Sequence, residues 1–169
     1  MMRNIKIEKV TLNIGAGKDQ ERLEKGILLL KALTGIAPVK TTTSKRIPEW
    51  GLRPGLPIGC KLTLRGKIAA ELLRRLLEAK DFLLSEKQFS DGGIVSFGIA
   101  EYIDVPGIKY DPKIGIMGFE ACITLERNGF RIKRRVAMRR KIPKNHRITK
   151  QEAIEFMAKN FNVRTGESA

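Results

Sequence analysis

Two stretches of the chain alternate apolar and polar residues, and each is followed by a stretch with helical spacing. Residues 5–14 place Val10, Leu12 and Ile14 on one side of an extended chain, and residues 60–65 repeat the pattern. Strict alternation predicts strands with one buried and one wet side. Residues 20–34 and 67–80 carry apolar residues every three or four positions, which predicts amphipathic helices. The expected fold is α+β, with helices packed on one face of a mostly antiparallel sheet and a polar, basic opposite side.

Other segments complete this expectation. Residues 39–43, 94–99 and 119–125 are predicted strands, and the sequence TKQE at 149–152 is a capping box that begins a C-terminal helix over 149–161. The Asn128-Gly129 pair favours a hairpin, so residues 127–150 are predicted to form a basic hairpin and tail. Six prolines and glycines between Ser44 and Gly59 predict a long protruding loop over 44–59. Because the sequence has no linker long enough to separate two domains, residues 1–169 are expected to form a single domain.

The net charge of +15 points to a polyanionic partner. Residues 121–150 carry eleven basic side chains and one acidic, and residues 38–67 carry seven and one, whereas residues 68–120 carry six and nine. Cations grouped in this way repel one another unless nucleic acid or an acidic surface neutralises them. We found no apolar run near the roughly 20 residues that span a bilayer. The expectation is a cytoplasmic protein that binds nucleic acid and enters no membrane.

We found no motif for catalysis or cofactor binding in the sequence. The glycines before Lys18 lack phosphate-loop spacing, and two cysteines with one histidine make no zinc cluster. Glu101, Asp104 and Asp111 are interpreted as solvated loop carboxylates. We therefore expect no enzyme activity, no metal and no cofactor. An RNA-processing or RNA-modifying enzyme with the same basic surface is the alternative, and a DNA-architectural protein is a third.

The expected RNA contacts fall in two groups. Polar positions of the two alternating strands offer donors to phosphates, 2′-hydroxyls and base edges, although a merely wet sheet face has the same pattern. Residues 131–150 hold ten cations and no acid, which favours contacts to the RNA backbone over base stacking. The predicted rRNA-binding residues are Lys9, Thr11, Asn13, Lys61, Thr63, Arg65, Arg134, Arg135, Arg139, Arg140, Lys141, Lys144 and Arg147.

Five segments resemble the universal large-subunit ribosomal protein number five family, in its archaeal and eukaryotic form. They are KIEKVTLNIG at 6–15, PIGCKLTLRG at 57–66, FSDGG at 89–93, GIKYDP at 107–112 and GIMG at 115–118. The resemblance covers nearly the whole chain in family order. It implies a structural ribosomal protein that binds 5S rRNA and helps attach it to large-subunit rRNA in the central protuberance. The RNA-facing positions it implies match Lys9, Asn13, Thr63 and Arg65.

The same resemblance implies further partners. The loop over 44–59 corresponds to one that reaches tRNA in the peptidyl site, with Lys45, Arg46, Trp50 and Arg53 as its contacts. A neighbouring 5S-binding ribosomal protein, and a small-subunit ribosomal protein across the subunit interface, are also implied. The competing interpretation of Trp50, the only tryptophan in the chain, is that its ring folds back to cap the core.

Overall fold

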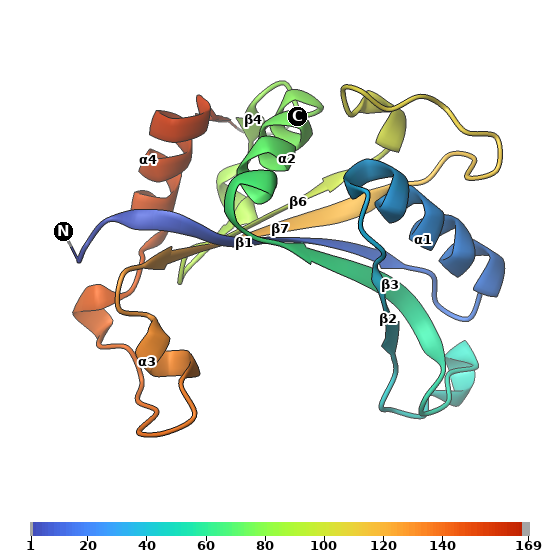
Figure 1. The fold of residues 1–169 in the computed structure, drawn as a ribbon, viewed down its shortest axis with the longest axis horizontal. Helices are drawn as coiled ribbons and strands as arrows, with labels where there is room; N and C mark the ends of the chain where they lie inside the picture. The colour runs from blue at the N-terminus through green and yellow to red at the C-terminus, as the bar shows by residue number, and fades with distance from the viewer. Residues whose placement is uncertain (1, 167–169) are drawn as a thin grey trace. The chain divides into compact units, whose positions relative to one another are not determined.

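The structure is a computed structural model that describes residues 2–166 (Figure 1). Within these residues, six strands form one sheet in the order β2-β3-β1-β7-β6-β5, and two short strands pair as β4-β8. The sheet strands are β1 (Ile5–Gly15), β2 (Val39–Thr42), β3 (Pro57–Leu64), β5 (Phe89–Ser90), β6 (Ile94–Ile99) and β7 (Phe119–Arg127), and the short pair is β4 (Leu83–Leu84) with β8 (Arg164–Thr165). The helices are α1 (Gln20–Thr34), α2 (Gly66–Glu78), α3 (Arg131–Arg134) and α4 (Lys150–Phe161). The predicted α+β class with a mostly antiparallel sheet is confirmed.

The chain forms two compact units, and three strands contribute residues to both. The first unit comprises Met1–Val10, Arg65–Phe97 and Cys122–Ala169, and the second comprises Thr11–Leu64 and Gly98–Ala121. β1, β6 and β7 each supply residues to both units. Each unit has its own set of buried apolar side chains, so each is described by itself below.

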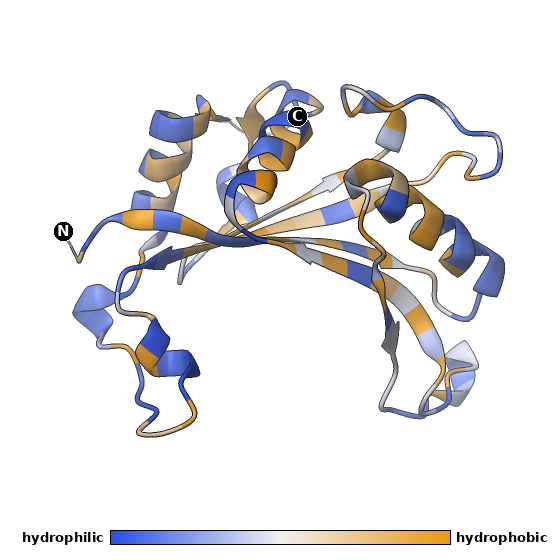
Figure 2. Cartoon of the chain, viewed as in Figure 1, coloured by the Kyte–Doolittle hydropathy of each residue, from blue (hydrophilic) through white to orange (hydrophobic). Residues whose placement is uncertain are grey.

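In the first unit, Figure 1 shows α2 and α4 on one side of the strands and α3 on the other. Leu73, Leu76 and Leu77 of α2 and Met157 of α4 are fully buried. Figure 2 shows α4 hydrophilic along one side and hydrophobic along the other, as the spacing predicts. The predicted capping box is present, with Thr149 as the N-cap. The Thr149 backbone N–H donates to the Glu152 carboxylate and lowers its pKa, and Glu152 also pairs with the buried Arg127.

In the second unit, α1 packs on β3. Leu12 and Ile14 of β1 and Cys60 and Leu62 of β3 are buried, while the residues between them are partly or fully exposed. Gly26 of α1 faces Ile14 and Cys60, so the apolar sides of both strands lie under the same helix. Burial raises the pKa of the Cys60 thiol, which keeps this side chain neutral within the core. Alternation therefore identified the buried side of each strand correctly.

The predicted hairpin is wrong. β7 extends to Arg127. The chain then continues as α3 and an irregular stretch, where the hairpin required a second strand (Figure 1). A two-residue turn of the expected type needs a positive φ at both Asn128 and Gly129, and only Gly129 has one, at 93°. Residues 127–150 are thus a basic segment with one helical turn at Arg131–Arg134 and another at Lys144–His146.

The loop predicted over 44–59 is shorter and more structured than expected. β3 begins at Pro57, and β2 and β3 pair antiparallel. Within the loop, Pro48–Trp50 form a 3-10 turn, and Ile47 and Leu52 exchange backbone hydrogen bonds of 3.0 Å in both directions. These bonds satisfy backbone groups that a proline-rich loop leaves without partners. The loop therefore has a defined conformation at the end of the β2–β3 hairpin.

Candidate RNA-binding surface

The polar positions of β1 and β3 lie together in the second unit. Asn13, Lys61 and Thr63 are exposed, and Thr11 is half-buried. Because β1 and β3 are neighbours in the sheet and both turn their apolar sides toward α1, these four residues share the opposite face. We call Thr11, Asn13, Lys61 and Thr63 the polar strip. Its hydroxyl, amide and ammonium groups suit contacts to the phosphates, 2′-hydroxyls and base edges of RNA.

In the first unit, two carboxylates hold three of the cations. The Glu8 and Glu126 side chains are only 14% and 11% exposed. The Arg134 guanidinium contacts both of them, with an Nη2–Oε2 distance of 2.6 Å to Glu126. Arg65 lies 3.3 Å from Glu8, and Lys6 lies 3.4 Å from Glu126. We call Glu8 and Glu126 with these three cations the carboxylate cluster.

The carboxylate cluster fixes the direction of the predicted contacts Arg65 and Arg134. Their side chains are 55% and 46% exposed, so the guanidinium groups are held by carboxylates and still reach solvent. Each guanidinium has five N–H donors, which leaves donors for a phosphate after the pairing. Lys9, the remaining strand residue predicted in this unit, is half-buried. We expect the cluster to present these cations in a fixed geometry.

Sequence reasoning missed Glu8 and Glu126. One signal was available, because Glu126 is the single acid in the strongly basic stretch over 121–150. A single carboxylate among eleven cations is expected to form ion pairs with some of them, because opposite charges attract at short range. The sequence pattern predicted a hairpin where the structure has α3. The pairing of Glu126 with Arg134 of α3 was therefore found only from the structure.

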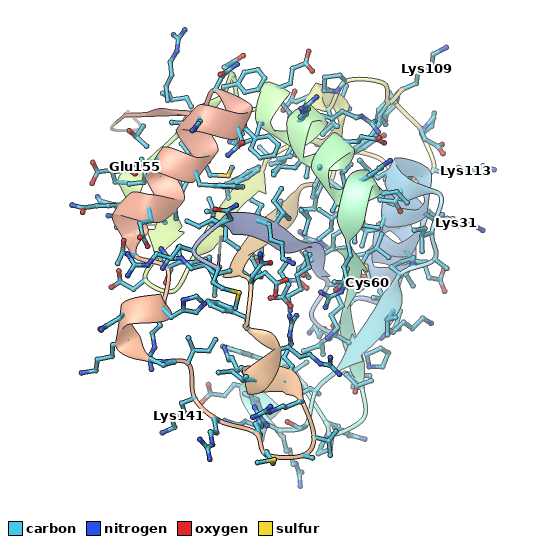
Figure 3. The ribbon with its side chains drawn as sticks, turned by 60° about the vertical axis from the view of Figure 1, so that its left-hand side comes forward. Lys31, Cys60, Lys109, Lys113, Lys141 and Glu155 are labelled. Carbon is cyan, nitrogen blue, oxygen red and sulfur yellow. The ribbon has the colours of Figure 1, made fainter. Side chains whose placement is uncertain are left out.

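The other predicted contacts of the basic segment lie between α3 and α4, on irregular backbone except for Lys144 in the short turn Lys144–His146. Arg139, Arg140, Lys141, Lys144 and Arg147 are exposed, and Arg135 is half-buried with its Nε donating to the Met138 carbonyl at 2.9 Å. Figure 3 shows Lys141 pointing outward from this segment. The segment is anchored by Ile142 and Ile148, which are 8% and 2% exposed. Anchored backbone with many solvent-exposed cationic side chains provides a dense positive surface.

In the second unit, the loop between β2 and β3 presents a separate set of groups. Lys45, Arg46 and Arg53 are exposed, and Trp50 is 66% exposed. The interpretation that Trp50 caps the core is therefore wrong; the buried residue of this loop is Leu52 at 8%. An exposed indole among cations suits stacking on a base or packing against a sugar.

Other site types lack support in the described residues. Residues 2–166 contain no cluster of three or more His, Cys, Asp or Glu residues that could hold a metal ion. Across the same residues, no helix is both long enough and apolar enough to span a bilayer.

Comparison with known proteins decides the family. Residues 1–53 match the family described as ribosomal protein L5, and residues 57–156 match the family model of the ribosomal L5 C-terminus. The chain belongs to the ribosomal protein L5 family. Large ribosomal subunit protein uL5 of Sulfolobus acidocaldarius is 49% identical over 163 residues, covering 96% of this chain and 92% of the relative. The Nanoarchaeum equitans protein of the same name is 50% identical and covers 96% of both chains.

Membership of the L5 family confirms the predicted resemblance. L5 proteins are structural components of the large ribosomal subunit, so the non-enzymatic class and the ribosomal location are confirmed too. The alternative of an RNA-processing enzyme and the alternative of a DNA-architectural protein are both set aside. An L5 protein assembles with rRNA and with other ribosomal proteins.

Proposed function

We propose that this L5 protein binds 5S rRNA and attaches it to large-subunit rRNA in the central protuberance. The observation that carries the proposal is the set of exposed cations on the anchored basic segment of the first unit, from Arg139 to Arg147. The polar strip of the second unit and the oriented Arg65 and Arg134 supply further donors. Phosphate contacts from such cations give affinity and position, while groups such as Asn13 and Thr63 contribute discrimination.

We also propose three partners beyond these RNAs. The β2–β3 loop suits peptidyl-site tRNA, because Trp50 and its neighbouring cations are exposed. The other two are a neighbouring 5S-binding ribosomal protein and a small-subunit ribosomal protein. The stretch over 68–120 carries nine acidic and six basic side chains, and such a net acidic stretch suits basic partners.

The salt dependence of 5S rRNA binding tests the role of the basic segment. Replacing Arg139, Arg140 and Lys141 with Gln removes three phosphate contacts, so the slope of log affinity against log salt should flatten by about two units. Filter binding at four or more salt concentrations measures this slope. Figure 3 shows Lys31, Lys109 and Lys113 on the second unit, where their replacement by Gln removes the same charge from exposed positions with no assigned RNA contact. An equal change of slope in both triple variants would show that only net charge matters.

The role of the β2–β3 loop can be separated from 5S rRNA binding. Changing Trp50 and Arg53 to Ala should leave the melting temperature and 5S rRNA affinity unchanged, because both side chains are exposed. Loss of one stacking contact should speed tRNA dissociation from the peptidyl site of reconstituted ribosomes by about tenfold. Glu49→Ala in the same loop is the control. Unchanged tRNA retention in the double variant would contradict the proposed tRNA contact.

A further inference from the structure

The basic segment and Gly92 line an open pocket of about 600 Å³ in the first unit. Five cations surround it: Lys133, Arg139, Arg140, Lys141 and Arg147. Phe130, Ile142 and Ile148 supply its apolar wall, and none of its described lining residues is acidic. The volume lies within the range of small-ligand pockets, roughly 300–1,000 Å³. A cationic rim around an apolar wall suits a ligand with an anionic part and a flat apolar part.

The wall of this pocket is fixed to the turn between β5 and β6. The Gly92 backbone N–H donates to the Ile148 carbonyl at 3.1 Å. Gly93 has a φ of 78°, and a Cβ there would lie 3.1 Å from the Ile148 side chain, so glycine allows Ile148 to approach. The Arg147 Nε donates to the Ile142 carbonyl at 3.3 Å, which restrains one of the rim cations. The pocket is therefore built from two chain segments held by specific contacts.

Phe130 is also held in place. Its ring meets the His146 ring edge-on, with centroids 5.7 Å apart and planes at 63°. The His146 Nε2 atom lies 2.9 Å from the Asn128 carbonyl oxygen, so the histidine is itself anchored. Phe130 is half-buried and keeps part of its surface at the pocket. A restrained aromatic ring beside cations is a platform on which a base stacks.

On the basis of the RNA binding proposed above, we propose that this pocket receives one unpaired nucleotide of the bound rRNA. The phosphate contacts the rim cations, and the base packs against Phe130 and Ile148. Duplex RNA does not fit this role, because its bases are stacked and paired. An acidic peptide would use the cations and leave the aromatic wall without a matching group. The expectation that backbone contacts dominate still holds for the segment as a whole, with this one base contact added.

The test uses the full-length protein and 5S rRNA. Phe130→Leu keeps an apolar wall and all the cations but removes the aromatic face, so affinity should fall about fivefold. The fall should be the same at every salt concentration, because no phosphate contact changes. Phe156→Leu, a half-buried ring on α4 in the same unit, is the matched control and should bind like the parent. Thermal unfolding of both variants checks that they fold.

The outcomes separate this inference from the proposed function. If the parent prefers 5S rRNA over duplex DNA and Phe130→Leu binds it equally well, the nucleotide pocket is wrong and 5S binding stands. A parent without that preference overturns the proposed function instead. A matching loss of affinity for polyglutamate in Phe130→Leu would identify a general anion pocket and also overturn the inference. If Phe130→Leu fails to fold, ultraviolet cross-linking of the parent must place an unpaired nucleotide on residues 130–148, and cross-links only elsewhere contradict the pocket.

Discussion

Replacing Gly59 with alanine should lower the free energy of unfolding by about 3 kcal/mol, the upper end of the cost of overpacking. Gly59 is buried in β3, where its pairing partner is Thr41 of β2. An alanine Cβ would lie 2.5 Å from the Ile14 carbonyl oxygen and 3.1 Å from the Thr41 hydroxyl. The carbonyl belongs to the backbone of β1 and cannot rotate away, so β1 and β3 must separate where their apolar sides pack under α1.

The melting temperature measures this effect. A loss of that size should lower it by roughly 6–12 °C in a chain of this length. Gly98→Ala is the control, because Gly98 lies in β6 and a Cβ there meets no atom within 4 Å. If the Gly59→Ala and Gly98→Ala proteins had the same melting temperature, the close approach of β3 to β1 would be contradicted.

Changing Glu8 and Glu126 together to Gln should weaken 5S rRNA binding by about tenfold, even though the protein becomes more positive. Charge alone predicts the opposite, since removing two acids near a polyanion strengthens attraction. The loss is expected because these carboxylates orient Arg134 and Arg65, and charge-assisted hydrogen bonds of this kind are worth about 1.5–3 kcal/mol. Freed guanidinium groups must be ordered again when the RNA binds, which costs side-chain entropy.

A matched variant with Glu78 and Glu155 changed to Gln makes the same charge difference on exposed positions of α2 and α4. Figure 3 shows Glu155 pointing outward from α4. This control should bind 5S rRNA as tightly as the parent or slightly more tightly. In addition, Arg134→Gln should weaken binding in the parent and have little effect once Glu8 and Glu126 are replaced. Tighter binding by the Glu8 and Glu126 variant would show that the carboxylates merely oppose the RNA.

Local pattern predicted the elements that local interactions determine. The α1 bounds follow from its apolar spacing and from Gly35, where the chain is left-handed with φ at 73°. The buried sides of β1 and β3 follow from alternation, and the start of α4 follows from its capping box. The polar strip was predictable for the same reason, since its residues alternate with the core.

The rest depends on contacts between residues far apart in the chain. Arg134 reaches Glu8 across 126 positions, and no local pattern indicates this pair. The two-residue strands β4 and β8 pair in parallel, with Leu83 opposite Arg164, and are too short to show a period. The Asn-Gly pair favours a hairpin locally, but the structure has α3 in this place, and Arg134 of α3 pairs with the distant Glu8 as well as with Glu126. The pocket beside Phe130 also depends on a distant residue, because Gly92 lines it. The sequence does not show that Gly92 and Phe130 line the same pocket.

The most direct test of the central claim is equilibrium binding of the full-length protein to archaeal 5S rRNA and to duplex DNA with the same number of phosphates. Near-physiological salt is essential, because low salt strengthens every phosphate contact alike. The oriented arginines, the polar strip and the nucleotide pocket together should give 5S rRNA a preference of about a thousandfold or more, as specific recognition of nucleic acid does. Equal affinity for the two nucleic acids would contradict 5S rRNA recognition and leave only a nonspecific basic surface.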